Sequence, residues 1–140
     1  MSDCVFCGIV EGNIPSTKVY EDDDVLAFMD IGPIVKGHVL VIPKQHHESI
    51  ADTPSDLLAK LIVVVQKIAR AQMDGLQAEG VNVHQSNGTV AGQVVPHIHF
   101  HLIPRYSEDG HSWNWSAKSY ADSGEALALA KRISKGLSRQ

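Results

Sequence analysis

Gly92-Gln93-Val94-Val95-Pro96-His97-Ile98-His99-Phe100-His101-Leu102-Ile103-Pro104-Arg105 is the stretch of sequence on which the fold depends. Side chains of an extended segment alternate between its two faces, so three imidazoles lie in one row and three apolar side chains lie in the other. The alternation alone predicts a half-buried strand with a polar outer face. Imidazole also serves as a nucleophile, a proton carrier or a metal ligand near neutral pH. Three in one row therefore indicate a chemical site.

The segments around this strand predict an α+β fold. Alternation and turn residues predict further strands at residues 17–21, 25–29, 39–42 and 81–86. A short helical turn is expected at residues 6–12, and helical spacing predicts helices at residues 54–73 and 126–137. This order, with its short early connections, implies a mainly antiparallel five-stranded sheet with a long central helix laid on it and a C-terminal helix.

The long helix has a strong start and a wide apolar stripe. Thr53 can cap it, with Pro54 at the first helical position. Val63 and Val64 widen the stripe beyond what covering one sheet requires. Two interpretations remain open, contact with a second copy of the chain and fuller burial inside the monomer.

Length and composition limit the class of protein. The 140 residues fit one domain, with a core at residues 4–105 and a C-terminal extension at residues 106–140. The net charge is −4 and the basic residues are scattered, which argues against nucleic-acid binding. The longest apolar run, Leu61 to Val65, is far shorter than the roughly 20 residues of a membrane helix. No N-terminal signal is visible, so we expect a cytoplasmic protein without membrane partners.

Cys4 and Cys7 are the only cysteines and form a Cys-x-x-Cys pair. Three interpretations compete: a redox pair, half of a zinc site, or two small buried apolar side chains. A redox motif usually follows a strand, and only three residues precede Cys4, so redox is the least favoured. Tetrahedral zinc needs two more ligands, and His46 and His97 are candidates.

The sequence resembles the histidine triad family, whose signature is His-apolar-His-apolar-His-apolar-apolar. The resemblance spans about residues 4–105 and includes four flanking motifs, Ala91-Gly92-Gln93, Ile103-Pro104-Arg105, Gly37 to Lys44 and Asp23 to Ile31. It implies a homodimer whose sheets join across the two-fold axis. For a bacterial-type member with a Cys-x-x-Cys pair, it also implies a structural zinc held by Cys4, Cys7, His46 and His97.

The resemblance further implies chemistry at the α-phosphate of a nucleotide, without a catalytic metal. His99 attacks the phosphorus of a nucleoside phosphoramidate, adenylate or dinucleoside polyphosphate, and water then releases a nucleoside monophosphate from the nucleotidyl-histidine. His101 donates to the phosphate and His97 supports the row. His38 is expected to hydrogen-bond the other histidines and so to fix which nitrogen of His99 carries the proton.

The same resemblance assigns residues to the binding of a purine nucleotide. Asp30 grips the ribose and Ile31 packs on the base, while a turn residue is the alternative for Asp30. The remaining assignments are an apolar wall for the base (Phe6 and Ile9, with ordinary core as the alternative) and contacts near the phosphate (Ser86, Gly92, Gln93 and Val94).

Two of these residues depart from the family pattern. Val94 replaces the common Ser or Thr, so a hydroxyl donor is missing, and such a loss costs up to about 2.7 to 4 kcal/mol. Ser86 replaces the usual Asn or Gln. A nucleotide- or partner-binding module with little or no turnover therefore remains an alternative function. A metal site that uses all three triad histidines is disfavoured, because few carboxylates lie near the triad.

The sequence leaves the roles of His84, Trp113 and Trp115 less defined. His84 lies on the polar face of its predicted strand and is expected to be a surface histidine or one with its hydrogen bonds satisfied. Three roles remain open for Trp113 and Trp115: they cover the site, pack against a partner chain or plug the end of the sheet.

Overall fold

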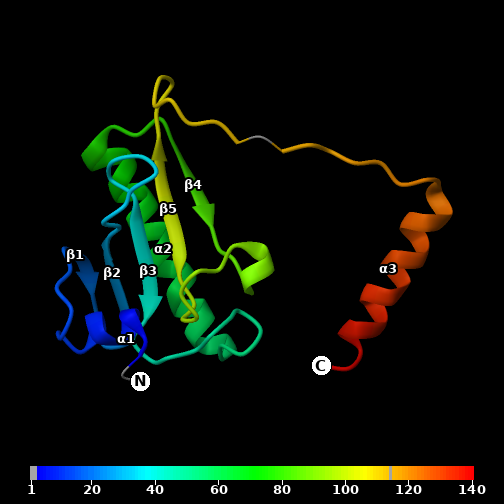
Figure 1. Cartoon of the computed structure of the whole chain (residues 1–140), viewed down its shortest axis with the longest axis horizontal. Coiled ribbons are helices and arrows are strands. Elements are labelled where there is room, and N and C mark those ends of the chain that lie inside the picture. Colours follow the sequence, from blue (N-terminus) through cyan, green and yellow to red (C-terminus); the bar gives the residue numbers. More distant parts are fainter. Residues whose placement is uncertain (1–2, 114) are drawn as a thin grey trace.

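The computed structural model describes residues 3–113 and 115–140 and contains a five-stranded sheet between two helices (Figure 1). All neighbouring strands pair antiparallel in the order β1-β2-β3-β5-β4, which confirms the predicted α+β fold. The elements are α1 Val5–Val10, β1 Lys18–Glu21, β2 Val25–Met29, β3 Val39–Pro43, α2 Ser55–Leu76, β4 Gly80–His84, the 3-10 turn η1 Thr89–Ala91, β5 Phe100–Arg105 and α3 Ser123–Leu137.

Both faces of the sheet are covered, and the sequences of the central strands reflect this. Strand β2 reads Val-Leu-Ala-Phe-Met, a continuous apolar run of the kind found in strands buried on two sides. Val25 and Ala27 pack in the cluster beneath α2, whereas Leu26 and Phe28 pack in the cluster with α1. The α1 face is the one toward which the triad histidines point.

The triad segment is only partly a strand, which corrects the prediction of one extended row. Strand β5 begins at Phe100, because the Ile98 N–H donates to the His47 carbonyl at 2.8 Å and not to a neighbouring strand. The alternation survives, since Ile98, Phe100 and Leu102 all lie in the core beneath α2. On the other face His97 and His99 are buried. A half-buried strand with a polar outer face is therefore wrong.

Helix α2 covers the sheet with a narrower stripe than the sequence predicts. Its buried residues are Leu57, Leu61, Val64, Val65, Ile68 and Gln72. Of the two residues that widen the stripe, Val64 is buried at 3% exposure, as fuller burial inside the monomer predicts, whereas Val63 is 49% exposed and Ile62 51%. Fuller burial therefore explains only part of the wide stripe. The Thr53 hydroxyl does not cap the helix, because it donates to the Ser49 carbonyl at 2.6 Å and the N-cap position is Pro54.

The C-terminal extension leaves the sheet after β5, and α3 stands apart from it (Figure 1). Asp122 caps α3 by accepting a hydrogen bond from the Glu125 N–H at 2.8 Å. The structure describes all 15 residues of α3, and none is buried. Its exposed apolar side chains include Leu127, Ile133 and Leu137. Among the described residues, none of the helices is long and apolar enough to span a bilayer.

Candidate active site and metal centre

A cavity of about 370 Å³ lies between α1, the end of β2 and the triad segment. This volume is within the range of small-molecule sites, and the walls are mostly apolar. The structure brings together at this cavity eight residues predicted for catalysis or nucleotide binding, namely Phe6, Ile9, Asp30, Ile31, Gly92, Val94, His99 and His101.

His99 lines this cavity, and one of its ring nitrogens makes no hydrogen bond to any residue that the structure describes. Its Nδ1 lies 2.8 Å from the carbonyl of His97 and donates to it, because a carbonyl can only accept. A neutral imidazole carries one N–H, so Nε2 keeps its lone pair. Burial lowers the pKa of His99, which keeps the ring neutral near pH 7. The ring packs edge-on against Phe6, with centroids 5.0 Å apart.

His38 and His101 form a proton chain whose direction follows from the backbone. The Ile34 N–H donates to Nδ1 of His38 at 3.2 Å, so the proton of a neutral His38 is on Nε2. That Nε2 lies 2.9 Å from Nδ1 of His101 and donates to it. His101 therefore carries its own N–H on Nε2. Burial lowers the pKa of His101 to about 4, with His99 and His38 adding to the effect. Near neutral pH this ring is thus a neutral donor.

The structure corrects the expected role of His38. The carbonyl of His97, and not His38, fixes the proton of His99. His38 acts on His101, because residue 101 pairs with Leu40 of β3 and so lies beside the residue that leads into β3. The Asp30 carboxylate is 3.6 Å from Nε2 of His38 and opposes the lowering of the His38 pKa by burial.

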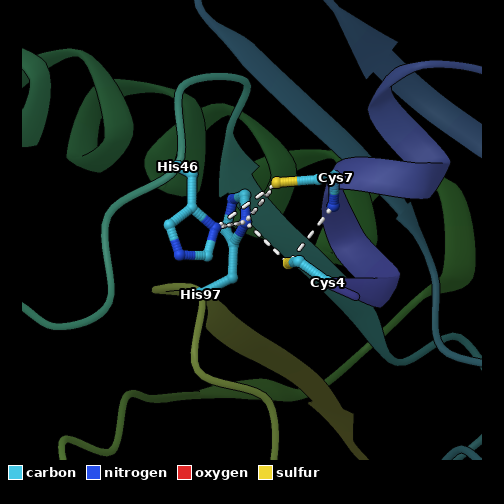
Figure 2. A group of neighbouring side chains, drawn as sticks. All are labelled: Cys4, Cys7, His46 and His97. Carbon is cyan, nitrogen blue, oxygen red and sulfur yellow. Dashed lines mark hydrogen bonds between the residues drawn. The ribbon is translucent and has the colours of Figure 1, made fainter. Parts of the chain in front are cut away.

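His97, the first histidine of the triad, faces Cys4 and Cys7 (Figure 2). Nδ1 of His97 is 3.4 Å from Sγ of Cys4, 3.6 Å from Sγ of Cys7 and 3.2 Å from Nδ1 of His46. Nδ1 of His46 is 3.3 Å from Sγ of Cys7. The other nitrogen of His97, Nε2, donates to the Pro43 carbonyl at 2.9 Å, which leaves Nδ1 unprotonated in the neutral ring.

These four residues fit a tetrahedral zinc ion. Zinc bonds of about 2.3 Å to sulfur and about 2.0–2.1 Å to nitrogen place sulfur and nitrogen ligands about 3.6 Å apart and two nitrogens about 3.3 Å apart. The observed separations are close to these values, and two sulfurs with two nitrogens are a typical structural zinc set. Both cysteines are buried free thiols, and burial raises the pKa of Cys7, which argues against a reactive redox pair.

Comparison with known proteins decides the family. Residues 11–108 match the HIT domain family. The chain belongs to the histidine triad (HIT) family. The adenosine 5′-monophosphoramidase hnt1 of Schizosaccharomyces pombe is 41% identical over 133 residues, which are 94% of this chain and 96% of that protein. The family and its relatives named as phosphoramidases support a nucleotide hydrolase at the level of the family.

Two solved structures of HIT proteins extend the comparison. A HIT family member from Bacillus subtilis is 43% identical with a TM-score of 0.87, over 95% of this chain and 96% of that chain. A zinc-bound histidine triad family protein from Mycobacterium smegmatis is 40% identical with a TM-score of 0.74, over 96% and 98%. Because residues 106–140 are a quarter of the chain, the higher TM-score requires much of this extension to superpose as well.

Asp30 lies at the rim of the cavity. One of its carboxylate oxygens stabilises a turn, which is the alternative role that the sequence offered for this residue. Its Oδ1 accepts from the Gly32 N–H at 2.8 Å, while Oδ2 faces His38. Ile31 and Val94 are 99% and 87% exposed at the cavity mouth. Gly92 has φ +95°, a conformation that favours glycine and keeps the backbone open beside the histidines.

Two predicted nucleotide-binding residues do not line the cavity. Gln93 is buried, and its side chain holds the loop together: Nε2 donates to the carbonyls of Glu48 and Val95, and Oε1 accepts from the Gly88 N–H. The structure therefore gives Gln93 a supporting position behind the rim. Ser86 lies next to Gly92, where its Oγ would be 4.0 Å from a Cβ atom built on that glycine. The same Oγ is 2.9 Å from Nε2 of His84.

His84 is a site neighbour that sequence reasoning missed. It is exposed, as a surface histidine should be, but it pairs with His101 across β4 and β5. The two ring centroids are 5.7 Å apart. The signal was available in principle, because residue 84 ends the strand that precedes the triad loop, but the pairing register of the two strands was needed to use it.

Proposed function

We propose that this HIT protein hydrolyses a purine nucleoside phosphoramidate, adenylate or dinucleoside polyphosphate at the α-phosphate through nucleotidyl-His99. One observation carries the proposal: the cavity is lined by an imidazole with a free Nε2 lone pair and by a neighbouring imidazole with an Nε2–H donor. The first ring is a nucleophile, and the second stabilises negative charge on a phosphate oxygen.

The reaction has two steps. Nε2 of His99 attacks the α-phosphorus, the bond to the leaving group breaks, and that group departs with the electron pair and takes a proton from solvent. The Nδ1–H of His99, held by the His97 carbonyl, stays in place while the ring becomes positively charged. Water then attacks the phosphorus and loses a proton to solvent, and the electron pair returns to Nε2. The nucleoside monophosphate is released.

The cavity accommodates the nucleotide by its distribution of polar groups. Phe6, Ile9 and Ile31 provide apolar surface for the purine. Among the described residues, Oδ1 of Asp30 accepts from a backbone N–H and Oδ2 does not, so Oδ2 is placed to accept from a ribose hydroxyl. The backbone around Gly92 offers N–H groups at the phosphate end.

Zinc is part of the proposal as a structural ion held by Cys4, Cys7, His46 and His97. It ties α1 to the triad segment and carries no step of the reaction. The carbonyl of the ligand His97 also orients His99, so the ion supports the position of the nucleophile. Zinc requires thiolates kept reduced, which agrees with a cytoplasmic location.

A homodimer is supported by the exposed apolar surface of this chain. Ile62 and Val63 of α2 are half exposed, and α3 buries none of its residues. The superposition on the Bacillus subtilis protein extends into residues 106–140. Helix α3, which is fully described and buries none of its own residues, is best explained by packing on a second copy of the chain.

A binding module with little turnover is the second candidate function, and Val94 favours it. This exposed side chain lines the cavity mouth without offering a hydroxyl to the phosphate. Only backbone donors and His101 then remain to stabilise the charge.

Release of AMP from adenosine 5′-phosphoramidate tests the proposal. We expect wild type and the control His47→Ala to release AMP, and His99→Ala to lose at least about 10³-fold in kcat. Short treatment with a chelator leaves the wild-type rate unchanged. Activity that survives in His99→Ala would remove the nucleophile, whereas AMP binding by all three proteins without turnover would favour the binding module.

A further inference from the structure

The hydroxyl of Ser86 lies on the open side of Gly92. Gly92 lines the nucleotide cavity. Apart from its own chain neighbours, the one described atom within 4 Å of a Cβ built on Gly92 is Oγ of Ser86, at 4.0 Å. Hydrogen bonds between oxygens span about 2.5–3.0 Å, so a phosphate oxygen roughly 1 Å farther into this space than the Cβ position reaches the hydroxyl. Ser86 thus offers a hydroxyl at the phosphate end of the cavity, where Val94 offers none.

A hydroxyl stabilises a phosphate only when its hydrogen points toward the phosphate, and a ring nitrogen of His84 controls this at Ser86. Nε2 of His84 lies 2.9 Å from Oγ of Ser86. Either group can be the donor, because an imidazole nitrogen and a hydroxyl can each donate or accept. When Nε2 carries the hydrogen, it donates to Oγ and leaves the hydroxyl hydrogen for a second acceptor. An unprotonated phosphate oxygen only accepts, so a bound phosphate selects this arrangement.

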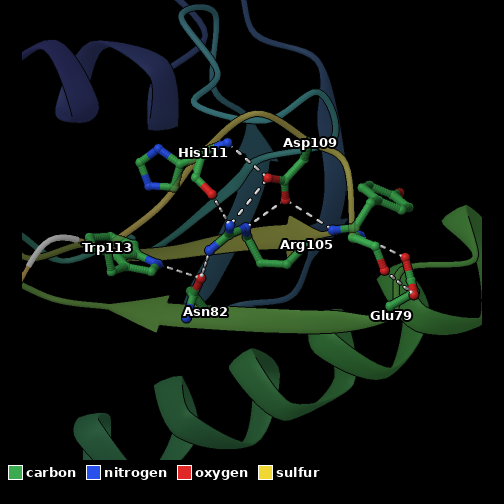
Figure 3. Close-up of polar contacts among 8 residues, drawn as sticks. Glu79, Asn82, Arg105, Asp109, His111 and Trp113 are labelled. Carbon is green, nitrogen blue, oxygen red and sulfur yellow. Dashed lines mark hydrogen bonds and ion pairs between the residues drawn. The ribbon is translucent and has the colours of Figure 1, made fainter.

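The His84 ring is held in place by two aromatic neighbours. The ring centroids of His101 and Trp113 each lie 5.7 Å from that of His84. Trp113 is fixed in turn by a polar network (Figure 3): its indole Nε1–H donates to Oδ1 of Asn82 at 2.7 Å, and the same oxygen accepts from Nη1 of Arg105 at 2.7 Å. Packing therefore restricts where Nε2 of His84 can point.

We propose that His84 is a positioning residue, which donates from Nε2 to Oγ of Ser86 and so turns the Ser86 hydroxyl toward the α-phosphate. This inference rests on the proposed function. The hydroxyl then stabilises negative charge on the phosphate in addition to the N–H of His101. His84 pairs with His101 across β4 and β5, so one strand register places both groups beside the phosphate.

Packing alone is the competing role for His84, and substitutions at this position separate the two roles. His84→Phe keeps a ring beside Trp113 but has no donor, and we expect it to lower kcat/KM for adenosine 5′-phosphoramidate about 10-fold. His84→Gln has no ring but keeps an amide N–H, and it is expected to stay within about 2-fold of wild type. His47→Phe makes the same exchange at a histidine that lines neither this cavity nor the surface beside Trp113, and leaves the rate unchanged.

A double-mutant cycle tests whether His84 acts through Ser86. Ser86→Ala removes the hydroxyl, and we expect a loss of about 10-fold in kcat/KM. If His84 acts only by orienting this hydroxyl, the double variant with His84→Phe loses no more than Ser86→Ala alone. The affinity for AMP, measured by calorimetry, follows the same pattern, because the product carries the same phosphate.

The possible failures are distinguishable. A wild-type rate in His84→Phe overturns the positioning role, and so do losses that multiply in the double variant. Equal losses in His84→Phe and His84→Gln also overturn it, since the imidazole donor is then not what Ser86 needs. If wild type binds AMP without turnover, the proposed function fails, while the pattern of AMP affinities still supports or overturns the role of His84. If wild type neither binds nor releases AMP, both fail.

Discussion

The two outer histidines of the triad, four residues apart, stand in clusters of opposite character. His97 meets two sulfurs and a second imidazole, and its unprotonated Nδ1 faces a point where all four ligand atoms converge. His101 accepts from Nε2 of His38, and Nδ1 of His38 accepts from the Ile34 N–H, so each link of this chain has one donor and one acceptor. The first arrangement offers ligand atoms to a cation. In the second, Nδ1 of His38 and Nδ1 of His101 already accept hydrogen bonds from N–H groups.

This difference explains how one short segment can serve both structure and chemistry. His99 lies between the clusters. Its only hydrogen bond to the first cluster is from Nδ1–H to the backbone carbonyl of His97. From the second it receives a neutral neighbour whose N–H points toward the same cavity. Metal binding at one end and proton order at the other are therefore separable by mutation.

Removal of the cysteine ligands has the largest expected effect. We predict that Cys4→Ser with Cys7→Ser loses zinc and more than about 4 kcal/mol of unfolding free energy, because α1 is released from the triad segment. Metal analysis and urea unfolding measure the two quantities. His38→Gln is the matched control from the other cluster and keeps about one zinc per chain. A double mutant that retains zinc at the wild-type stoichiometry contradicts the metal centre.

Acid tests the second cluster through stability. The folded-state pKa of His101, about 4, lies below its ordinary value of about 6.5, so the unfolded chain takes up the proton first as the pH falls. Stability is lost between about pH 6.5 and 4, by roughly 3 kcal/mol for this group. Unfolding free energies of wild type and His101→Gln across this range measure the difference. Parallel curves for the two proteins are inconsistent with a buried neutral His101.

Breaking the proton chain affects turnover more than binding. His38→Leu removes the donor to Nδ1 of His101 and is expected to lower kcat by roughly 10- to 100-fold. His38→Gln can still donate from its amide and loses less. Steady-state kinetics with adenosine 5′-phosphoramidate distinguish the two variants. Equal losses in both would show that the chain is not what orients His101.

The smallest expected effect is a gain. Val94→Ser supplies a hydroxyl at the cavity mouth, where Val94 is exposed, and is predicted to raise kcat/KM about 3- to 10-fold. Val94→Ala controls for the reduced bulk and leaves the rate near that of wild type. If the two variants behave alike, the missing donor is not what limits this protein.

The sequence was sufficient for the elements and for the metal cluster. Apolar runs and turn residues predict all five strands, with ends that shift by a few residues, and helical spacing predicts α2 and α3. Cys4, Cys7, His46 and His97 were grouped by ligand chemistry and family resemblance, and they do converge.

The sequence could not predict side-chain positions that depend on strand register or on local backbone geometry. The pairing of His84 with His101 follows from the register of β4 and β5. The hydrogen bond from Nδ1 of His99 to the His97 carbonyl is possible because β5 begins only at Phe100. The alternation of polar and apolar residues cannot reveal where the strand begins. Gln93 was assigned to the ligand because it matches a family motif that flanks the triad, yet its side-chain amide makes its hydrogen bonds within the loop.

Trapping of the covalent intermediate tests the central claim most directly. Rapid acid-free quenching of wild type with adenosine 5′-phosphoramidate, followed by proteolysis and mass spectrometry, should find one adenylyl group on the peptide that contains the triad, attached at His99. The adduct is absent from His99→Ala and present in His47→Ala. Turnover with an adduct on another residue, or an adduct that persists in His99→Ala, would contradict the account.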